Sequence, residues 1–234
     1  MAAPTLSELL TDIKALLQDT SWTDTQITAK INRNLQKIAK GIKKKTDDGS
    51  VVQMLPLPDL YTIGTVTTST SVPYVSLPSN YQRGLCYIER SAKIRVDIAD
   101  SFLEFMDDYP GLDRTHEVTE AAVKGSTLYY QGMPSTADTL TVHYYKKPST
   151  MSASDDEPEG LPEELAWDLL VYSTVKDYYL LIEDGMDGNT PNTVKYNSLF
   201  NGALEDLEAS IPVDGEPFSI FGNKSGRDAM YYRS

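Results

Sequence analysis

The chain has 234 residues, a hydrophobic fraction of 40%, 34 acidic side chains and 21 basic ones, which give a formal net charge of −13 at pH 7. This length suffices for one large or two small domains, and the composition is that of a globular protein. No stretch approaches the roughly 18 uninterrupted apolar residues of a membrane span, and the first residues lack the pattern of a secretion signal. We therefore expect neither membrane insertion nor secretion.

Two amphipathic helices are predicted in the first fifty residues. Thr5 and Glu8 form a capping-box pattern, in which two side chains satisfy each other's backbone N–H groups at the start of a helix. Thr23 and Gln26 repeat this pattern before the second helix. Apolar residues then recur at intervals of three and four, as they do on one face of a helix. The second helix is expected to continue through a lysine-rich segment to a turn at residues 47–49.

The second predicted helix carries a basic face opposite its apolar stripe. We interpret this face as an electrostatic seam between subunits, because a positive helix near the start of the chain and negative helices near its end favour head-to-tail association into a closed ring. The alternative is a nucleic-acid-binding accessory protein that uses the basic face of residues 30–45. The acidic total charge and the lack of aromatic residues on that face favour the seam. The seam residues are Lys30, Arg33, Lys37, Lys40 and Lys43.

Residues 50–148 change in character and predict an inserted antiparallel β-domain. Short runs rich in β-branched and aromatic residues are separated by Pro, Gly, Ser and Asn, which is typical of strands joined by turns. One short helix is expected at residues 99–108. The last two runs are expected to pair as a hairpin with a long tip. The predicted strands are 51–55, 62–68, 74–77, 85–88, 93–97, 117–123, 127–130 and 139–145.

Helical signals return after an acidic linker. Pro162 lies at a first helical position, where proline is tolerated, and Thr190 followed by Pro191 marks a second start. Because each amphipathic helix must bury its apolar stripe, the two helix pairs are expected to pack together. The predicted fold class is α+β, with a four-helix bundle of two N-terminal and two C-terminal helices, the inserted β-domain and an extended C-terminal arm. The expected domain limits are 1–49, 50–148, 149–212 and 213–234.

Most of the acidity lies in residues 150–210, which carry 14 acidic and 2 basic side chains. A surface of this charge repels phosphates. One interpretation is a solvated linker with solvated helix faces. The other is the lining of a conduit through which DNA slides without binding. The candidate residues are Asp155, Asp156, Glu157, Glu159, Glu163 and Glu164.

The sequence nominates no catalytic, metal or cofactor site. The chain has two histidines, His116 and His143, and a metal site would need both of them with nearby acids. Cys86 lies in an apolar run and is expected to act as a small buried hydrophobe. The acidic run 155–159 lacks the alternation and central glycine of a calcium loop. We therefore expect a protein that is not an enzyme and binds no cofactor.

After Pro212 no helical or strand periodicity remains, and residues 213–234 have two interpretations. The segment is either a disordered tail or an arm that orders on a partner. Its scattered aromatic residues are of the kind that anchor interfaces. The sequence leaves both interpretations open.

Four segments resemble, in this order along the chain, the head-to-tail adaptor proteins of tailed bacteriophages. The first is Ile-Asn-Arg-Asn-Leu-Gln-Lys-Ile-Ala at 31–39, and the second is Val-Ser-Leu-Pro-Ser-Asn-Tyr at 75–81. The third is the strand end Tyr-Tyr-Lys-Lys-Pro at 144–148, and the fourth is the helix start Leu-Pro-Glu-Glu-Leu at 161–165. The last two segments are the most specific.

This resemblance implies a structural virion protein of the neck, assembled in the host cytoplasm. It implies a dodecameric ring that docks on the portal, extends the DNA channel and offers an attachment surface to tail or nozzle proteins. Genomic DNA would pass through the ring without specific binding. The family supplies no catalytic residues, and its C-terminal segment inserts into the portal. The portal-docking residues here would be Phe218, Ile220, Phe221, Arg227, Met230, Tyr231 and Tyr232.

Overall fold

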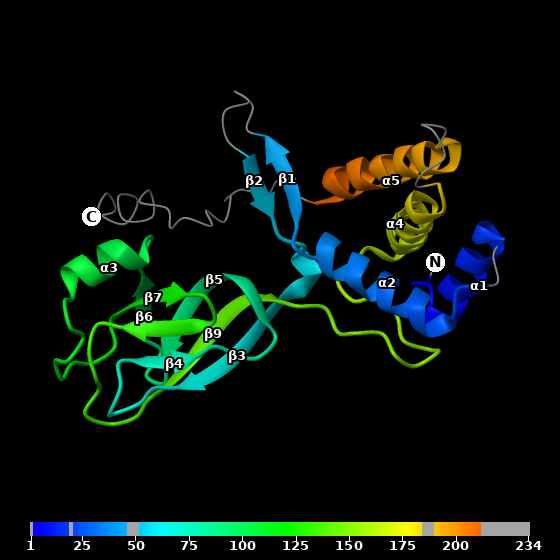
Figure 1. Cartoon of the computed structure of the whole chain (residues 1–234). Coiled ribbons are helices and arrows are strands. Elements are labelled where there is room, and N and C mark those ends of the chain that lie inside the picture. Colours follow the sequence, from blue (N-terminus) through cyan, green and yellow to red (C-terminus); the bar gives the residue numbers. More distant parts are fainter. Residues whose placement is uncertain (1, 19–20, 46–51, 184–189, 212–234) are drawn as a thin grey trace. The chain divides into compact units, whose positions relative to one another are not determined.

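A computed structural model of the chain describes residues 2–18, 21–45, 52–183 and 190–211. In this described part the fold is α+β, with five α-helices and a curled seven-stranded sheet (Figure 1). The chain divides into two compact units. Met1–Leu60 and Lys147–Pro212 form the first, called here the helical unit, and Tyr61–Lys146 form the second, called here the β unit.

Both predicted capping boxes are confirmed at the starts of the first two helices. The Thr5 side chain accepts a hydrogen bond from the Glu8 N–H, and the Glu8 carboxylate accepts one from the Thr5 N–H. Thr23 and Gln26 make the same pair of bonds. The elements of the helical unit are α1 (Leu6–Leu17), α2 (Asp24–Ile38), β1 (Ile42–Lys45), β2 (Val52–Leu55), a short 3-10 turn (Pro58–Leu60), α4 (Glu163–Ile182) and α5 (Pro191–Ser210).

The second helix is shorter than the sequence predicts. α2 ends at Ile38, and strand β1 begins at Ile42 and pairs antiparallel with β2. Gly41 lies between them with a φ of 95°, a left-handed conformation that glycine adopts readily and that terminates helices. Lys43 therefore belongs to a strand, and the lysines of residues 30–45 do not form one helix face.

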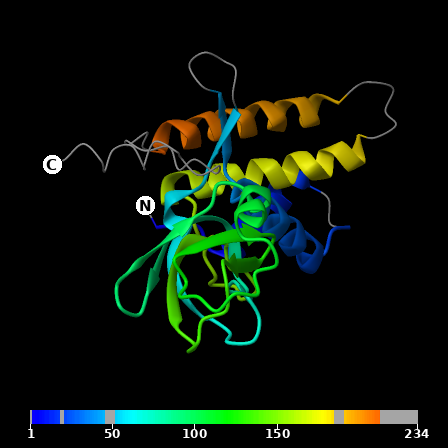
Figure 2. The ribbon, with the colours of Figure 1, turned by 90° about the vertical axis from the view of Figure 1, so that its left-hand side faces the viewer.

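Helix α4 is the centre of the helical unit, because it packs against α1, α2 and α5. Figure 2 shows α4 and α5 lying side by side. The prediction of a single buried stripe is wrong for α4, since a helix contacted from three sides is buried in several directions. Ile182 of α4 and Val194 of α5 are apolar but 39% and 65% exposed. The buried residues of α4 are Ala166, Leu169, Leu170, Val171, Ser173, Thr174, Val175 and Tyr178.

A buried asparagine joins α2 to the segment that returns from the β unit. Asn32 donates from Nδ2 to the Met151 carbonyl at 2.8 Å and accepts at Oδ1 from the Met151 N–H at 2.9 Å. Both residues are buried. The chain leaves the helical unit at Leu60, and Gly160 lies against that residue with a φ of 83°. A Cβ on Gly160 would lie 2.4 Å from Leu60 Cδ2, so the exit and the return of the chain pack without space for a side chain.

The start of α5 is capped by a carboxylate from the end of α4. Thr190 was the predicted cap, but its side chain makes no capping bond. Instead, Glu183 accepts from the N–H groups of Asn192 and Thr193 and from both of their side chains, at 2.7 to 3.1 Å. Burial opposes ionisation of Glu183, but these hydrogen bonds outweigh it, so its pKa lies below the ordinary value of 4.5.

The β unit is a mixed sheet. Its strand order is β3-β9-β5-β6-β7-β8-β4. The predicted antiparallel arrangement is wrong at one place, because β6 and β7 pair in parallel. The elements are β3 (Tyr61–Thr67), β4 (Tyr74–Ser76), β5 (Tyr81–Arg90), β6 (Arg95–Ile98), α3 (Phe102–Asp108), β7 (Glu120–Lys124), β8 (Thr127–Tyr130) and β9 (Thr139–Lys146).

The hairpin predicted for the last two strands is not formed. β8 pairs with β7 and β4, whereas β9 pairs with β3 and β5. The tight turn lies one connection earlier, where Gly125, with a φ of 65°, joins β7 to β8. The predicted pairing of β8 with β9 rested on their closeness in the sequence. It is wrong because the eight residues between β8 and β9 lead across the sheet instead of turning back.

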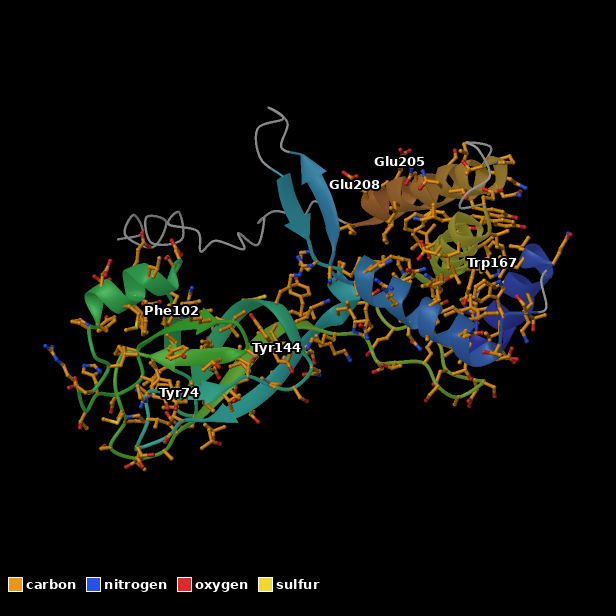
Figure 3. All side chains as sticks on the ribbon, viewed as in Figure 1. Tyr74, Phe102, Tyr144, Trp167, Glu205 and Glu208 are labelled. Carbon is orange, nitrogen blue, oxygen red and sulfur yellow. The ribbon has the colours of Figure 1, made fainter. Side chains whose placement is uncertain are left out.

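The inner face of the curled sheet holds the core of the β unit. Tyr144, labelled in Figure 3, is 2% exposed and packs over Gly64, where a Cβ would lie 3.1 Å from the ring. Its hydroxyl donates to Asn80 Oδ1 at 2.6 Å, which ties the segment 75–81 to β9. The buried core residues are Val66, Leu77, Ile88, Val96, Val118, Ala121, Leu128, Tyr130, Leu140, Val142 and Tyr144.

We expect Asn32→Ala to lower the free energy of unfolding of the helical unit by about 2–4 kcal/mol, because it leaves the buried N–H and carbonyl of Met151 without partners. Both tryptophans, Trp22 and Trp167, lie in this unit, so urea unfolding followed by tryptophan fluorescence reports on it alone. Asn201→Ala, an exposed position on α5, is the matched control. Equal stability of the Asn32→Ala variant and the wild type would show that the contact is dispensable.

The low pKa of Glu183 predicts an acid-dependent stability of the helical unit. A carboxyl whose pKa is depressed by folding stabilises the fold above its unfolded pKa, and this contribution disappears as the pH falls through the folded value. Glu183→Gln should therefore be less stable than the wild type at pH 7, with the difference shrinking toward pH 3. Glu205→Gln, an exposed position, serves as the control. A stability difference that stayed constant with pH would contradict this assignment.

Candidate interaction surfaces

Two of the five predicted seam cations are paired within the chain. Lys30 Nζ and Lys37 Nζ each lie 3.6 Å from Oδ2 of Asp177 on α4. Lys37 also donates to Asn34 Oδ1 at 3.2 Å, and Asn34 Nδ2 donates to the Thr174 hydroxyl at 3.4 Å. These lysines therefore help to hold α2 on α4. The sequence analysis did not identify Asp177 as the partner of these lysines, although an acid among the apolar residues of α4 is a signal for a pair of this kind.

Two further seam cations are available on the surface. Arg33 of α2 and Lys40, which lies in the turn after α2, are both exposed. In the described part of the chain neither takes part in a salt bridge. Lys43 lies in β1, where its side chain is outside the described structure. The exposed positive face of α2 is therefore smaller than the sequence predicts.

The acidic segment is folded by two of its own carboxylates. Asp156 accepts from the Ser152 and Ala153 N–H groups at 2.5 and 2.7 Å, and these backbone hydrogen bonds lower its pKa. Glu159 accepts from the Ser149 N–H at 2.7 Å. The segment in turn supplies backbone carbonyls to the first N–H groups of α1, from Asp156 to Leu6 and from Ser154 to Ser7. The acids that remain exposed are Asp155, Glu157, Glu163 and Glu164.

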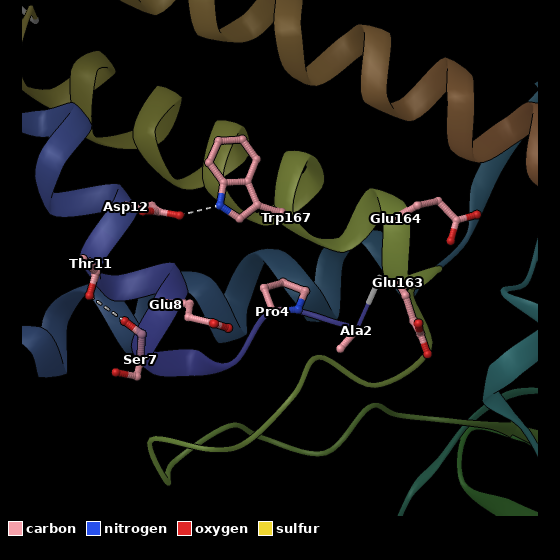
Figure 4. A pocket seen from close by; sticks show the side chains of 9 residues that line it. All are labelled: Ala2, Pro4, Ser7, Glu8, Thr11, Asp12, Glu163, Glu164 and Trp167. Carbon is pink, nitrogen blue, oxygen red and sulfur yellow. Dashed lines mark hydrogen bonds between the residues drawn. The ribbon is translucent and has the colours of Figure 1, made fainter.

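A shallow groove lies where α1 and α4 begin, and Figure 4 shows it. Its volume is about 440 Å³, and Trp167 forms one wall, with its indole N–H donating to Asp12 at 2.7 Å. Acids at the starts of helices complement the helix dipole, which accounts for their presence here. Its lining contains neither histidine nor cysteine, and the Thr11 hydroxyl donates to the Ser7 carbonyl. It is lined by Ala2, Pro4, Ser7, Glu8, Thr11, Asp12, Glu163, Glu164 and Trp167.

The one cysteine and both histidines of the chain lie in the β unit. Burial raises the pKa of the Cys86 thiol to about 12, so the thiol stays protonated and is a poor nucleophile at neutral pH. His143 is bonded through Nδ1 to the Tyr61 hydroxyl, and His116 through Nδ1 to the Glu117 carbonyl. Among the described residues, no three His, Cys, Asp or Glu side chains gather where they could hold a metal ion. Likewise, no helix described by the structure is long and apolar enough to cross a membrane.

The predicted arm cannot be compared with the structure. Residues 213–234, including the seven proposed portal-docking residues, lie outside the described residues. The arm therefore stays a prediction from the sequence.

A comparison with known protein families gives a match that covers both units of the chain. The model of a family described as "SU10 adaptor protein" matches residues 4–217, which include all the described elements of both units. A search of curated proteins gives no match. The family is one of structural proteins that join the head of a phage to its tail. The chain belongs to the SU10 adaptor protein family of phage head-to-tail adaptors.

Proposed function

We propose that the chain forms a ring that docks on the portal, extends the DNA channel and presents an attachment surface to tail proteins. The observation that carries this proposal is the family match over residues 4–217. A protein that works by assembly needs surfaces for its neighbours and has no need of a reactive centre.

The helical unit is proposed to act as the four-helix bundle that builds the ring wall. In this unit α4 packs against three helices. Asn34 of α2 donates a hydrogen bond to Thr174 of α4, and Glu183 at the end of α4 accepts one from the Asn192 N–H of α5. The exposed acids of the 155–164 segment are proposed to line the channel or its rim, where they would repel the phosphates of passing DNA. The β unit is proposed to face the tail. Assembly in the host cytoplasm and a final position in the virion neck follow from this role.

The copy number proposed for the ring is twelve, as the family resemblance implies. Neighbouring copies would join through two different surfaces, which is the requirement for a closed head-to-tail ring. The seam is proposed to use Arg33 and Lys40, because Lys30 and Lys37 are engaged by Asp177 of the same chain. Many copies of a modest contact would give a stable assembly.

Deleting residues 213–234 should abolish binding to the portal and leave both units folded. The deletion removes the aromatic anchors of the arm and no described element. Cosedimentation with purified portal rings measures portal binding, and far-ultraviolet circular dichroism of the truncated chain checks the folding of both units. Normal attachment of the truncated chain to the portal would refute the assignment of the arm.

Arg33→Glu combined with Lys40→Glu should weaken ring closure at low salt, where electrostatic contacts are least screened. Lys37 is left unchanged so that its pairing with Asp177 survives. Lys195→Glu, which reverses an exposed cation on α5, is the matched control. Ring yield by electron microscopy at low and high salt gives the readout. Assembly of the double variant at the wild-type level in low salt would contradict the seam.

A further inference from the structure

The outer face of the curled sheet, opposite the core, is covered by α3 over part of its width. Phe105 of α3 and Ala122 of β7 are 1% and 0% exposed and form a small second core there. Tyr109, which follows α3, donates its hydroxyl to Glu120 Oε2 of β7 at 3.0 Å. Figure 1 shows α3 on the side of the sheet that carries β6 and β7. The helix is therefore fixed over β7, four places along the sheet from β3.

The outer face over β3, β9 and β5 carries a row of apolar and aromatic side chains. Ile63, His143 and Tyr87 lie side by side in strand register, and the rings of Tyr87 and His143 have centroids 5.2 Å apart. Tyr61 adds its ring beside them and bonds to His143. Tyr61 and Ile63 are 43% and 57% exposed. In the described part of the β unit no helix covers this row, which is called here the bare sheet face.

The bare sheet face is bordered by cations. Arg95 of β6 is exposed, and its guanidinium lies 5.9 Å from the centre of the Tyr87 ring. Arg83 of β5 lies beside Tyr145 in register on the same face. One acid, Glu89, also belongs to it and accepts a hydrogen bond from the Tyr87 hydroxyl at 3.2 Å. An apolar row with arginines at its border suits a partner that is apolar at its centre and acidic around it.

The exposed side of α3 combines an apolar residue with acids. Leu103 is 74% exposed, the largest value among the exposed large hydrophobic residues of the described chain. Glu104, Asp107 and Asp108 are also exposed, and on a helix they lie along one flank of Leu103. Lys124 of β7 lies over the Phe102 ring of this helix, 4.7 Å from its centroid. The helix thus presents one exposed apolar side chain flanked on one side by carboxylates, away from its own buried Phe105.

We propose that, in the ring, the Leu103 side of α3 from one subunit packs on the bare sheet face of the next, with Asp107 near Arg95. Because α3 is held over β7 of its own sheet, it does not reach the bare sheet face of the same chain. The complementary charge and polarity of the two surfaces therefore indicate a second copy as the partner. The contact joins two different surfaces, so it propagates around a ring instead of stopping at a dimer. This inference rests on the proposed ring assembly and names the β-unit surfaces that would close it.

Paired cysteines test the contact directly. A chain carrying Leu103→Cys and Ile63→Cys is bound to portal rings and treated with a short bis-maleimide linker, and its products are separated under denaturing conditions. Since each copy would be linked to both neighbours, we expect a ladder of dimer, trimer and larger species. The native Cys86 is a weak background reaction because its thiol stays protonated. Leu103→Cys with Thr136→Cys, an exposed loop position, is the matched control and should give no ladder.

The outcomes separate this inference from the proposed function. A ladder in the first variant and none in the control supports the contact. A ring on the portal, seen by electron microscopy, without a ladder overturns the contact and leaves the adaptor function intact. Dimers from Ile63→Cys alone would show that two sheet faces meet, which also overturns it. If the wild type makes no ring on the portal, the proposed function fails and the contact falls with it.

A charge exchange gives a second readout that does not depend on linker chemistry. Arg95→Glu should reduce ring yield, because it places a fourth acid against the carboxylates of α3. Arg95→Glu combined with Asp107→Arg should restore the yield by reversing the pair. Both positions are exposed, so neither change disturbs the core of the β unit. A full ring yield of Arg95→Glu, or no recovery of the yield in the double variant, would overturn the pairing.

Discussion

The helical unit depends on one buried contact, the double hydrogen bond between Asn32 and the backbone of Met151. The unit is made of two stretches separated by the whole β unit, so nothing in local sequence brings them together. Asn32 satisfies both polar groups of one peptide-chain residue in a dry environment, where leaving them unpaired is costly. In the same unit, Gly160 packs against Leu60 with no space for a Cβ. The segments that leave and re-enter the helical unit, at Leu60 and Gly160, are therefore in contact with each other. Helix α4, which follows Gly160, packs against α1, α2 and α5.

Charges in this chain serve the fold before they serve assembly. Asp177 draws two lysines of α2 onto α4, Asp156 shapes the returning segment, and Glu183 starts α5. Asp156 lies in an acidic segment whose composition alone would place it on a solvated surface, whereas Asp177 lies among apolar residues of α4. A limited set of exposed side chains lies outside these pairs. On the β unit they include Leu103 and the acids of α3, and the bare sheet face with its bordering arginines. A chain arranged in this way has two unlike surfaces with which to meet its neighbours.

Local rules gave the starts of the elements, and tertiary contacts decided the rest. The capping boxes at Thr5 and Thr23 and the proline at the start of α5 are local devices, so they could be predicted from a few adjacent residues. The end of α2 was missed although Gly41 was visible, because the lysine-rich continuation kept a helical pattern. The partner of β8 and the all-round burial of α4 depend on which strands and helices lie beside them. The engagement of Lys30 and Lys37 by Asp177 was also not predictable from composition, since it requires α4 to lie beside α2.

We propose above all that this chain is an adaptor that closes a ring on the portal. Native mass spectrometry of the full chain mixed with purified portal is the most direct test, because the mass of the complex counts the bound copies. We expect a single complex in which one portal carries one closed ring of this chain, with twelve copies and no partly filled intermediate at saturation. A portal that keeps its own mass beside free monomers of the chain would contradict it.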